Sequence, residues 1–223
     1  MAPATLTSEE ARRAVAAELT GVDGRPVRRL IAGVTGPPGA GKSTFASGLV
    51  DELNAWSPSS AAYLPMDGFH LAKVQLDRLG ARQRRGAPDT FDVDGYRAIL
   101  TRLTHSYAVA DVFVPDFDRR LDDPVAAARV VPARARVVVT EGNYLALAAD
   151  GWAAVRPLLE RLYYVDALPD VRRRRLLDRH TRSGLAAMEA QRWVDTVDEP
   201  NARLIAATRP SCDTVLLIRD GSA

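Results

Sequence analysis

The segment from Gly36 to Thr44 constrains the fold of this chain more than any other stretch, and it reads Gly-Pro-Pro-Gly-Ala-Gly-Lys-Ser-Thr. Its spacing, a glycine, four residues and then Gly-Lys-Ser, predicts a phosphate-binding loop. Glycines let the backbone curl around an anion so that successive N–H groups point at phosphate oxygens. The apolar run Leu30 to Val34 precedes the segment, and apolar residues at helical spacing follow it. The loop is therefore expected to join a strand to a helix whose N-terminus faces the phosphates.

Two side chains of the loop have distinct roles in that chemistry. Lys42 is expected to reach the β- and γ-phosphates, and the hydroxyl of Ser43 is expected to bind Mg²⁺. The chain keeps only two lysines, Lys42 and Lys73, among 30 basic side chains. Because Lys42 is expected to bind phosphates and Ser43 a metal ion, we predict ATP and Mg²⁺ as cofactors. The predicted nucleotide-binding residues are Gly36, Gly39, Ala40, Gly41, Lys42, Ser43 and Thr44.

Composition limits the class of protein. The chain has 223 residues and a formal net charge of +2, which argues against a nucleic-acid-binding surface. A single cysteine, Cys212, excludes an internal disulfide and fits a reducing compartment. No apolar run approaches the roughly 18 residues of a membrane span, and the N-terminus lacks a hydrophobic signal core. We expect one cytoplasmic domain over residues 1–223, without a nucleic-acid or membrane partner, and leave a homodimer open.

Apolar runs alternate with helical patterns along the chain. A capping box at Thr7–Glu10 predicts an N-terminal helix over about 7–20, followed by a turn-rich linker at 22–26. Strands are expected at 30–34, 61–66, 137–140, 162–166 and 214–218, with a strand or hairpin at 112–119. Helices are expected at about 71–80, 93–107, 152–159, 169–184, 186–197 and 202–208. The alternation predicts an α/β fold of three α/β/α layers, with a mostly parallel five-stranded sheet and a helical lid at 169–184.

Acidic residues follow two of these strands. Asp67 comes after the run at 61–66, and Glu141 comes after the run at 137–140. The carboxyl ends of parallel strands share one edge of the sheet, so both residues are expected beside the loop. One carboxylate there can accept the proton of an acceptor hydroxyl, and another can hold Mg²⁺ directly or through water. We assign Asp67 as the base, also within reach of the metal, and Glu141 to the metal. The alternative for each is a turn residue that caps the next helix.

The helix expected at 169–184 is rich in arginine. Arg172, Arg175 and Arg179 fall on one side of it, where they could clamp a transferring phosphate and close over the site. Ordinary surface charge paired with Asp170 and Asp178 is the alternative. The histidines offer no third ligand at useful spacing, so a zinc site is not expected.

With these residues placed, the chain resembles the P-loop kinases that include uridine kinase, phosphoribulokinase and type I pantothenate kinase. The resemblance covers nearly all of the chain after about Leu30 and is strongest to small bacterial nucleoside/nucleotide kinase-like or fructose-transport-associated kinase-like proteins. It implies that Asp67 is the catalytic aspartate, that Glu141 assists the metal, and that Arg175 and Arg179 act from a lid. The segments that carry it are 36–44, 67–70, 85–92, 115–119, 141–144 and the helix around 175–180.

The sequence says less about the acceptor of the phosphoryl group than about the nucleotide. Uridine kinases carry Phe-Asp-His-Pro where this chain has Arg85-Gly86-Ala87-Pro88, so the aspartate that helps to grip the ribose is missing. The segment around Pro88 is similar to one in type I pantothenate kinases, which are considerably longer. We predict that the acceptor is bound by His70, Asp89, Asp92, Asp118, Arg119, Asn143 and Tyr144.

These residues favour a kinase that phosphorylates a hydroxyl of a small polar metabolite, a sugar or a sugar-like compound. A nucleoside such as uridine or cytidine, or a pantothenate-type compound, is the alternative acceptor. A GTPase is disfavoured because no Asn-Lys-x-Asp element is present. A P-loop ATPase or nucleotide sensor is disfavoured because the polar clusters exceed what hydrolysis requires.

Overall fold

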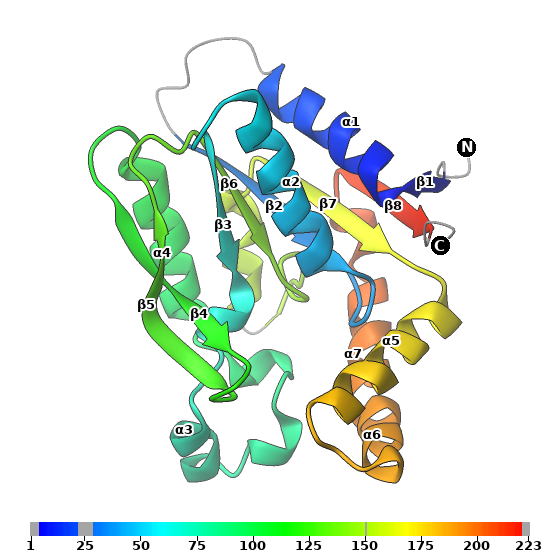
Figure 1. The fold of residues 1–223 in the computed structure, drawn as a ribbon. Coiled ribbons are helices and arrows are strands. Elements are labelled where there is room, and N and C mark those ends of the chain that lie inside the picture. Colours follow the sequence, from blue (N-terminus) through cyan, green and yellow to red (C-terminus); the bar gives the residue numbers. More distant parts are fainter. Residues whose placement is uncertain (1–4, 22–28, 150, 220–223) are drawn as a thin grey trace.

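A parallel six-stranded sheet runs through the molecule in the order β1-β8-β7-β2-β6-β3 (Figure 1). The computed structural model describes residues 5–21, 29–149 and 151–219. The central strand β2 pairs with β6 on one side and with β7 on the other. The strands are β1 (Thr5–Thr7), β2 (Leu30–Thr35), β3 (Ala61–Pro65), β6 (Val137–Glu141), β7 (Arg161–Asp166) and β8 (Thr214–Arg219).

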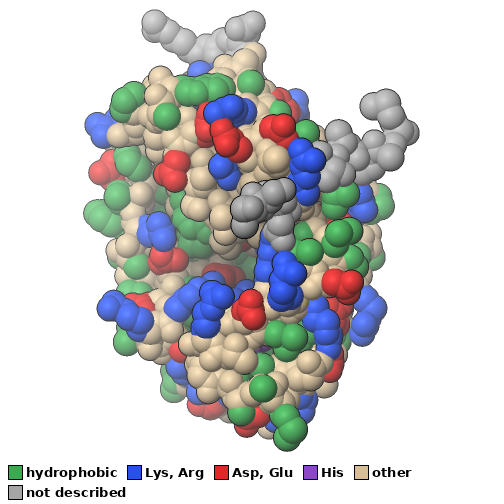
Figure 2. Space-filling model, turned by 45° about the vertical axis from the view of Figure 1, so that its right-hand side comes forward, with side chains coloured by type: hydrophobic (Ala, Val, Ile, Leu, Met, Phe, Trp, Pro, Cys, Tyr) green, Lys and Arg blue, Asp and Glu red, His purple; other side chains and the backbone are tan. Residues whose placement is uncertain are grey.

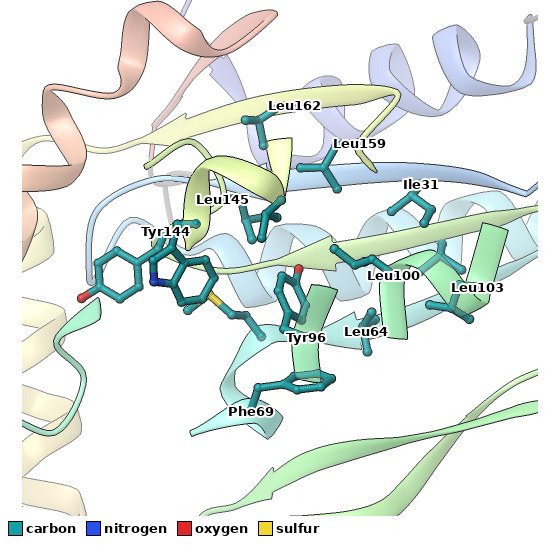
Figure 3. Close-up of a cluster of buried hydrophobic side chains, with 14 of the residues drawn as sticks. Ile31, Leu64, Phe69, Tyr96, Leu100, Leu103, Tyr144, Leu145, Leu159 and Leu162 are labelled. Atoms are coloured by element: carbon teal, nitrogen blue, oxygen red, sulfur yellow. The ribbon is translucent and has the colours of Figure 1, made fainter. Parts of the chain in front are cut away.

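Helices cover both faces of this sheet. On one face lie α1 (Ser8–Thr20) and α2 (Lys42–Trp56), and on the other lie α4 (Val93–His105) and short 3₁₀ turns (Figure 1). Every residue of β2 and of β6 is buried, as expected for strands covered on both sides. Figure 3 shows the apolar cluster between the sheet and α4, where Leu64 of β3 packs near Leu100. The predicted three-layer fold is confirmed.

The sheet has one strand more than the five predicted. The additional strand β1 is three residues long and pairs with β8 at the edge of the sheet. It ends at Thr7, which is also the N-cap of α1, and Glu10 completes the predicted capping box. The amide of Glu10 donates to Thr7 Oγ1 at 3.2 Å, and the amide of Thr7 donates to Glu10 Oε2 at 2.8 Å. So short a strand carries too little alternation to be distinguished from the cap that follows it.

Further elements lie around the carboxyl edge of the sheet, where the strands end (Figure 1). The expected hairpin is an antiparallel pair, β4 (Val112–Asp118) and β5 (Asp123–Val131), and α3 (Lys73–Arg78) lies near its turn. The arginine-rich helix α5 (Pro169–Arg182) is followed by α6 (Ala187–Trp193), a π-helical turn at Val194–Asp198, and α7 (Glu199–Ala206).

The helix expected at 152–159 is present as two 3₁₀ turns, Trp152–Ala154 and Arg156–Leu158, and not as one continuous helix. Pro157, which has no N–H, stands at the start of the second turn and ends any regular hydrogen-bond ladder there. The linker expected at 22–26 lies outside the described residues. Within residues 5–21, 29–149 and 151–219, no helix has the length and apolar character needed to cross a membrane.

A buried arginine fastens the amino end of β2, which positions the loop at its other end. The guanidinium of Arg29 is 1% exposed, and burial lowers its pKa. Its nitrogens donate hydrogen bonds of 2.7–3.1 Å to the carbonyls of Leu103, Pro132, Ala133 and Ala135 and to the hydroxyl of Ser106.

We predict that Arg29→Ala lowers the free energy of unfolding by about 3 kcal/mol or more, because several buried carbonyls lose their donor. Urea denaturation followed by circular dichroism measures the change. Arg102→Ala, which removes an exposed arginine near the end of α4, is the control and should change stability little. Equal stability of the two variants would contradict this role for Arg29.

Candidate active site

The predicted phosphate-binding loop connects β2 to α2, and its glycines have conformations that other residues rarely adopt. Gly41 is the N-cap of α2 with φ of 94°, and Gly39 has φ of 77°. A Cβ on Gly39 would lie 2.7 Å from the carbonyl oxygen of Arg172, so α5 also packs closely against the loop. Both the backbone conformation and this close packing therefore require glycine.

Lys42 begins α2 and lies folded over the loop. Its residue is 8% exposed, and Nζ donates to the carbonyl oxygen of Pro37 at 3.1 Å. Burial lowers the pKa of Lys42 to about 8, and the carboxylates of Glu141 and Asp67 oppose that shift. The ammonium group is thus held in a site from which water is largely excluded, where its attraction for phosphate oxygens is strong.

Glu141 is the last residue of β6, and its side chain is buried next to the loop. Oε1 accepts a hydrogen bond from the hydroxyl of Tyr63 at 2.9 Å, and Ser43 also hydrogen-bonds to this carboxylate. Burial, and then the nearby charge of Asp67, raise the pKa of Glu141 to about 7, whereas Lys42 acts to lower it. The structure therefore brings Lys42, Ser43, Asp67 and Glu141 to one place at the carboxyl edge of the sheet.

The oxygen ligands gathered here suit Mg²⁺. The described residues contain no group of three or more His, Cys, Asp or Glu side chains that could hold a metal by themselves. Mg²⁺ is commonly bound through one or two protein oxygens, with phosphate oxygens and water completing its octahedron. The hydroxyl of Ser43 with the carboxylates of Glu141 and Asp67 offers that set.

Asp67 lies in the 3₁₀ turn Met66–Phe69 that follows β3. Its side chain is 35% exposed, and Oδ2 is 3.5 Å from Nη2 of Arg119. The next residue must be small, because a Cβ on Gly68 would come within 2.6 Å of the carbonyl oxygen of Pro115 in β4. The turn is thereby pressed against the hairpin, and the carboxylate of Asp67 stays open to an incoming molecule.

His70, three residues further on, has a defined protonation state. Its Nδ1 is 2.9 Å from the carbonyl oxygen of Asp67, which can only accept, so Nδ1 carries the proton. Burial lowers the pKa of His70, so the ring is neutral at pH 7 and Nε2 presents a lone pair. The ring is held between Phe91 and Phe117, with centroid distances of 4.0 and 5.3 Å. His70 can therefore accept a hydrogen bond from a bound hydroxyl.

Tyr144 joins the apolar cluster to the 85–88 segment, and its part in acceptor binding stays a prediction. Its ring lies in the apolar cluster, and Figure 3 shows its hydroxyl oxygen pointing out of one end of that cluster. The hydroxyl donates to the carbonyl oxygen of Gly86, to which Asn201 of α7 also donates at 3.5 Å. Tyr144 therefore holds the 85–88 segment in place. The neighbouring Asn143 accepts a hydrogen bond at its backbone carbonyl from Thr35, at 3.0 Å.

The three remaining carboxylates of the predicted acceptor set make local contacts. Asp92 is the N-cap of α4 and accepts from the amide of Gly95 at 2.9 Å. Asp118 accepts from the amides of Arg120 and Leu121 in the hairpin turn. Asp89 forms an exposed ion pair with Arg84 at 2.8 Å. These contacts are typical of aspartates that cap helices, close turns or pair on the surface. Their part in acceptor binding stays a prediction.

The arginines of α5 face the loop and the helices that follow. Arg172 is buried, donating to the carbonyl of Pro38 at 3.3 Å, so it belongs to the packing between helix and loop. Arg175 donates to the carbonyl of Gly39 at 3.1 Å. Arg179 lies 3.8 Å from Asp198, which also pairs with His180 at 2.7 Å. Figure 2 shows a hollow with acidic side chains at its floor and basic side chains around its rim.

Several residues at the site were not predicted. Tyr63 bonds to Glu141, and Arg85 stacks over the ring of Phe117, with its guanidinium carbon 5.0 Å from the ring centroid. A tyrosine within an apolar strand is most simply a core residue, and only the register between β3 and β6 shows otherwise. Cys212 is no rival nucleophile, since burial raises the pKa of its thiol to about 11.

A parallel sheet whose central strand runs into a phosphate-binding loop, with carboxylates at the neighbouring strand ends, defines a P-loop nucleotide-binding protein, the class to which P-loop kinases belong. Comparison with known proteins identifies the family: the model of the phosphoribulokinase / uridine kinase family matches residues 31–189. The chain belongs to this family. It is 35% identical over 169 residues to a Schizosaccharomyces pombe protein provisionally named a uridine kinase, covering 74% of this chain and 72% of that protein.

Other relatives agree with this assignment. A crystal structure from Silicibacter sp. TM1040, of a protein provisionally named a fructose transport system kinase, matches with a TM-score of 0.81 and 33% identity. The match covers 94% of this chain and 98% of that one. An ATP-dependent kinase of Lachancea thermotolerans is 31% identical over 180 residues, which covers 62% of this chain and 52% of that protein. The protein is thus a kinase of a family that uses ATP on small-molecule acceptors.

We predict that Lys42→Ala abolishes most of the ATP-dependent activity, because the loop loses the cation that neutralises the phosphates. The fold should survive, since the ammonium group contacts the loop rather than the apolar core. ATP turnover, with calorimetric titration of ATP beside it, measures the first effect, and a thermal unfolding curve measures the second. Arg13→Ala, on the exposed side of α1, is the matched control. Near-normal ATP use by the Lys42 variant would contradict the assignment of this segment as the phosphate-binding loop.

Proposed function

We propose that this kinase transfers the γ-phosphoryl group of ATP to a hydroxyl of a small polyhydroxylated metabolite, a sugar or a sugar-like compound. The observation that carries the proposal is the position of Asp67. Its carboxylate is partly exposed beside the buried Lys42, at the point where the loop, β3 and the hairpin meet. A general base needs this combination of access to the acceptor and closeness to the phosphates.

Each residue has a role in the proposed reaction. The backbone of the loop and Lys42 hold the phosphates, and Arg175 and Arg179 add positive charge from α5. The oxygen of the acceptor hydroxyl attacks the γ-phosphorus, and Asp67 accepts the proton of that hydroxyl. The bond between the γ-phosphorus and the oxygen that bridges it to the β-phosphate breaks, and ADP leaves. His70 accepts a hydrogen bond from another hydroxyl of the acceptor and so fixes its orientation.

Mg²⁺ fits beside the loop on the oxygen donors of Ser43, Glu141 and Asp67. When bound, the ion would neutralise charge on the β- and γ-phosphates. The chain's contribution is to keep Glu141 ionisable in a buried place, where Lys42, Tyr63 and Ser43 favour its charged form against the cost of burial. Arg172 donates to the carbonyl of Pro38 in the loop, and its part in clamping the phosphate stays a prediction.

The acceptor class rests on the residues around Asp67. His70 offers an acceptor atom, Arg119 a charged donor, and Phe117 an apolar wall over which Arg119 lies at 5.9 Å. Arg119 could pair with a carboxylate or a phosphate of the acceptor. The fructose-related name of the Silicibacter relative supports a sugar-like compound.

A nucleoside is the second candidate acceptor. The Schizosaccharomyces pombe relative bears a uridine kinase name, and that is the observation in its favour. Against it, Gly86 stands where uridine kinases have the aspartate that helps to grip ribose, and its carbonyl is already bonded to Tyr144. A pantothenate-type acceptor has only the resemblance around Pro88 to support it. A cytoplasmic location and a homodimer stay predictions.

We expect Asp67→Asn to lower kcat by about 10²–10⁴-fold, because the amide keeps the shape of the side chain but accepts no proton. ATP affinity should change much less, since Asp67 lies on the acceptor side. Steady-state kinetics with the best acceptor, and calorimetry with ATP, separate the two quantities. Full kcat in this variant would move the base elsewhere, with Asp92 or Asp118 as the next candidates.

A panel of acceptors tests the substrate class. Fructose and other sugars, sugar acids, uridine, cytidine and pantothenate are compared by ADP release against ATP alone. We expect strong stimulation by one sugar or sugar-like compound, with analogues lacking one hydroxyl disfavoured by ~10⁴-fold or more, as is usual for sites built on buried hydrogen bonds. A wide preference for uridine or cytidine would overturn the acceptor proposal and leave the roles of Lys42 and Asp67 standing. Turnover independent of any acceptor would indicate an ATPase.

A further inference from the structure

Tyr63 lies outside the predicted set of site residues, yet its hydroxyl touches the carboxylate of Glu141, the residue assigned to the metal. It lies on the edge strand β3 opposite Val139, two residues before the pair formed by Pro65 and Glu141. Its ring packs against the cluster under α2, on the same face of the sheet as Val139. A tyrosine side chain is about as long as two residues of a strand. The hydroxyl of Tyr63 therefore lies at the end of the strands, next to Glu141.

The contacts of this hydroxyl are specific. It donates to Oε1 of Glu141 at 2.9 Å and also hydrogen-bonds to Ser43, the residue that follows Lys42 in α2. A carboxylate oxygen can only accept when ionised, so the phenol hydroxyl of Tyr63 is the donor in this contact. Because the hydroxyl engages one carboxylate oxygen, it fixes the rotation of the carboxylate and leaves the other oxygen for the loop.

The ring of Tyr63 is held in turn by the hairpin. The guanidinium carbon of Arg129, in β5, lies 5.1 Å from the ring centroid, and Nε of Arg129 donates to Asp116 of β4 at 2.6 Å. A cavity of about 380 Å³ borders both Tyr63 and Arg129, so apolar packing covers only part of the ring. The hairpin that supplies Arg129 also carries Phe117 and Arg119 on the acceptor side.

We propose that Tyr63 is a positioning residue that orients Glu141 toward the metal, and that Arg129 links this orientation to the acceptor hairpin. The proposal deepens the proposed function and rests on its assignment of Glu141 to the metal side. A buried carboxylate beside a metal is commonly oriented by a hydrogen-bonding partner of this kind, whose loss costs about 10–100-fold in metal affinity.

The test measures metal binding directly. Binding of Mn²⁺, as a probe for Mg²⁺, is followed by electron paramagnetic resonance in the presence of ADP for the full chain and its variants. Tyr63→Phe should weaken Mn²⁺ binding about tenfold or more and leave ADP binding without metal unchanged. Its ring still fills the same space, so the fold is kept, as a thermal unfolding curve confirms. Tyr107→Phe is the matched control, because Tyr107 lies near Arg29 at the opposite end of β2.

A double-mutant cycle distinguishes positioning from a general effect. If Tyr63 acts through Glu141, Tyr63→Phe has little further effect on Mn²⁺ affinity once Glu141→Gln is present. Equal losses in both backgrounds, or wild-type Mn²⁺ affinity in Tyr63→Phe, would overturn the role of Tyr63. Arg129→Gln should cost less, roughly two- to fivefold, as a cation–π contact does; no loss there would overturn the link to the hairpin.

These outcomes are separate from those of the proposed function. The measurement needs no acceptor, so a wrong acceptor class leaves it unaffected. Normal Mn²⁺ binding by Glu141→Gln would instead show that the metal assignment itself is wrong. In kinetics, excess Mg²⁺ should restore kcat to Tyr63→Phe with little change in the KM for ATP, a pattern that a loosened fold would not give.

Discussion

Burial of opposite charges beside the phosphate loop is the constraint on which the rest of this site depends. Lys42 and Glu141 are 8% and 3% exposed, and each has a pKa moved toward its neutral form by that burial. Neither charge could be kept in such a place alone, because an unpaired buried charge costs several kcal/mol. Their mutual attraction, with the donor groups around them, favours the charged form of each against the cost of burial. Nucleotide phosphates and a cation then complete a site that the protein alone leaves only partly compensated.

The parallel sheet is what brings these charges together, and this much follows from the sequence. The loop motif fixes a strand, a turn and a helix, and the acidic residues after two other apolar runs must share the same edge. The prediction thus placed Lys42, Asp67 and Glu141 side by side without any knowledge of their contacts. It succeeded because the period of the strands and the spacing of the loop are local properties, which a single sequence displays in full.

Other features depend on contacts that a sequence does not display. Asp92 and Asp118 have the same residue type as Asp67, yet one caps α4 and the other closes the hairpin turn. Which role an aspartate takes depends on whether backbone amides or open space lie in front of it. Tyr144 illustrates the same point, since its hydroxyl donates to the carbonyl of Gly86, a contact that the sequence does not display. The three-residue strand β1 was missed, and the turns after Gly151 were predicted as one helix, because they are too short for a period.

The hairpin contacts both sides of the proposed site. Its strand β4 packs closely against Gly68, next to the proposed base Asp67, and its turn carries Arg119, which lies 3.5 Å from the carboxylate of Asp67. Its other strand supplies Arg129, which lies over Tyr63 and so reaches Glu141 through a single hydroxyl. A molecule that displaces Arg119 from Asp67 therefore acts on the same element that borders the metal side. One pair of strands thus contacts residues of both proposed sides of the site, although these residues are distant in sequence.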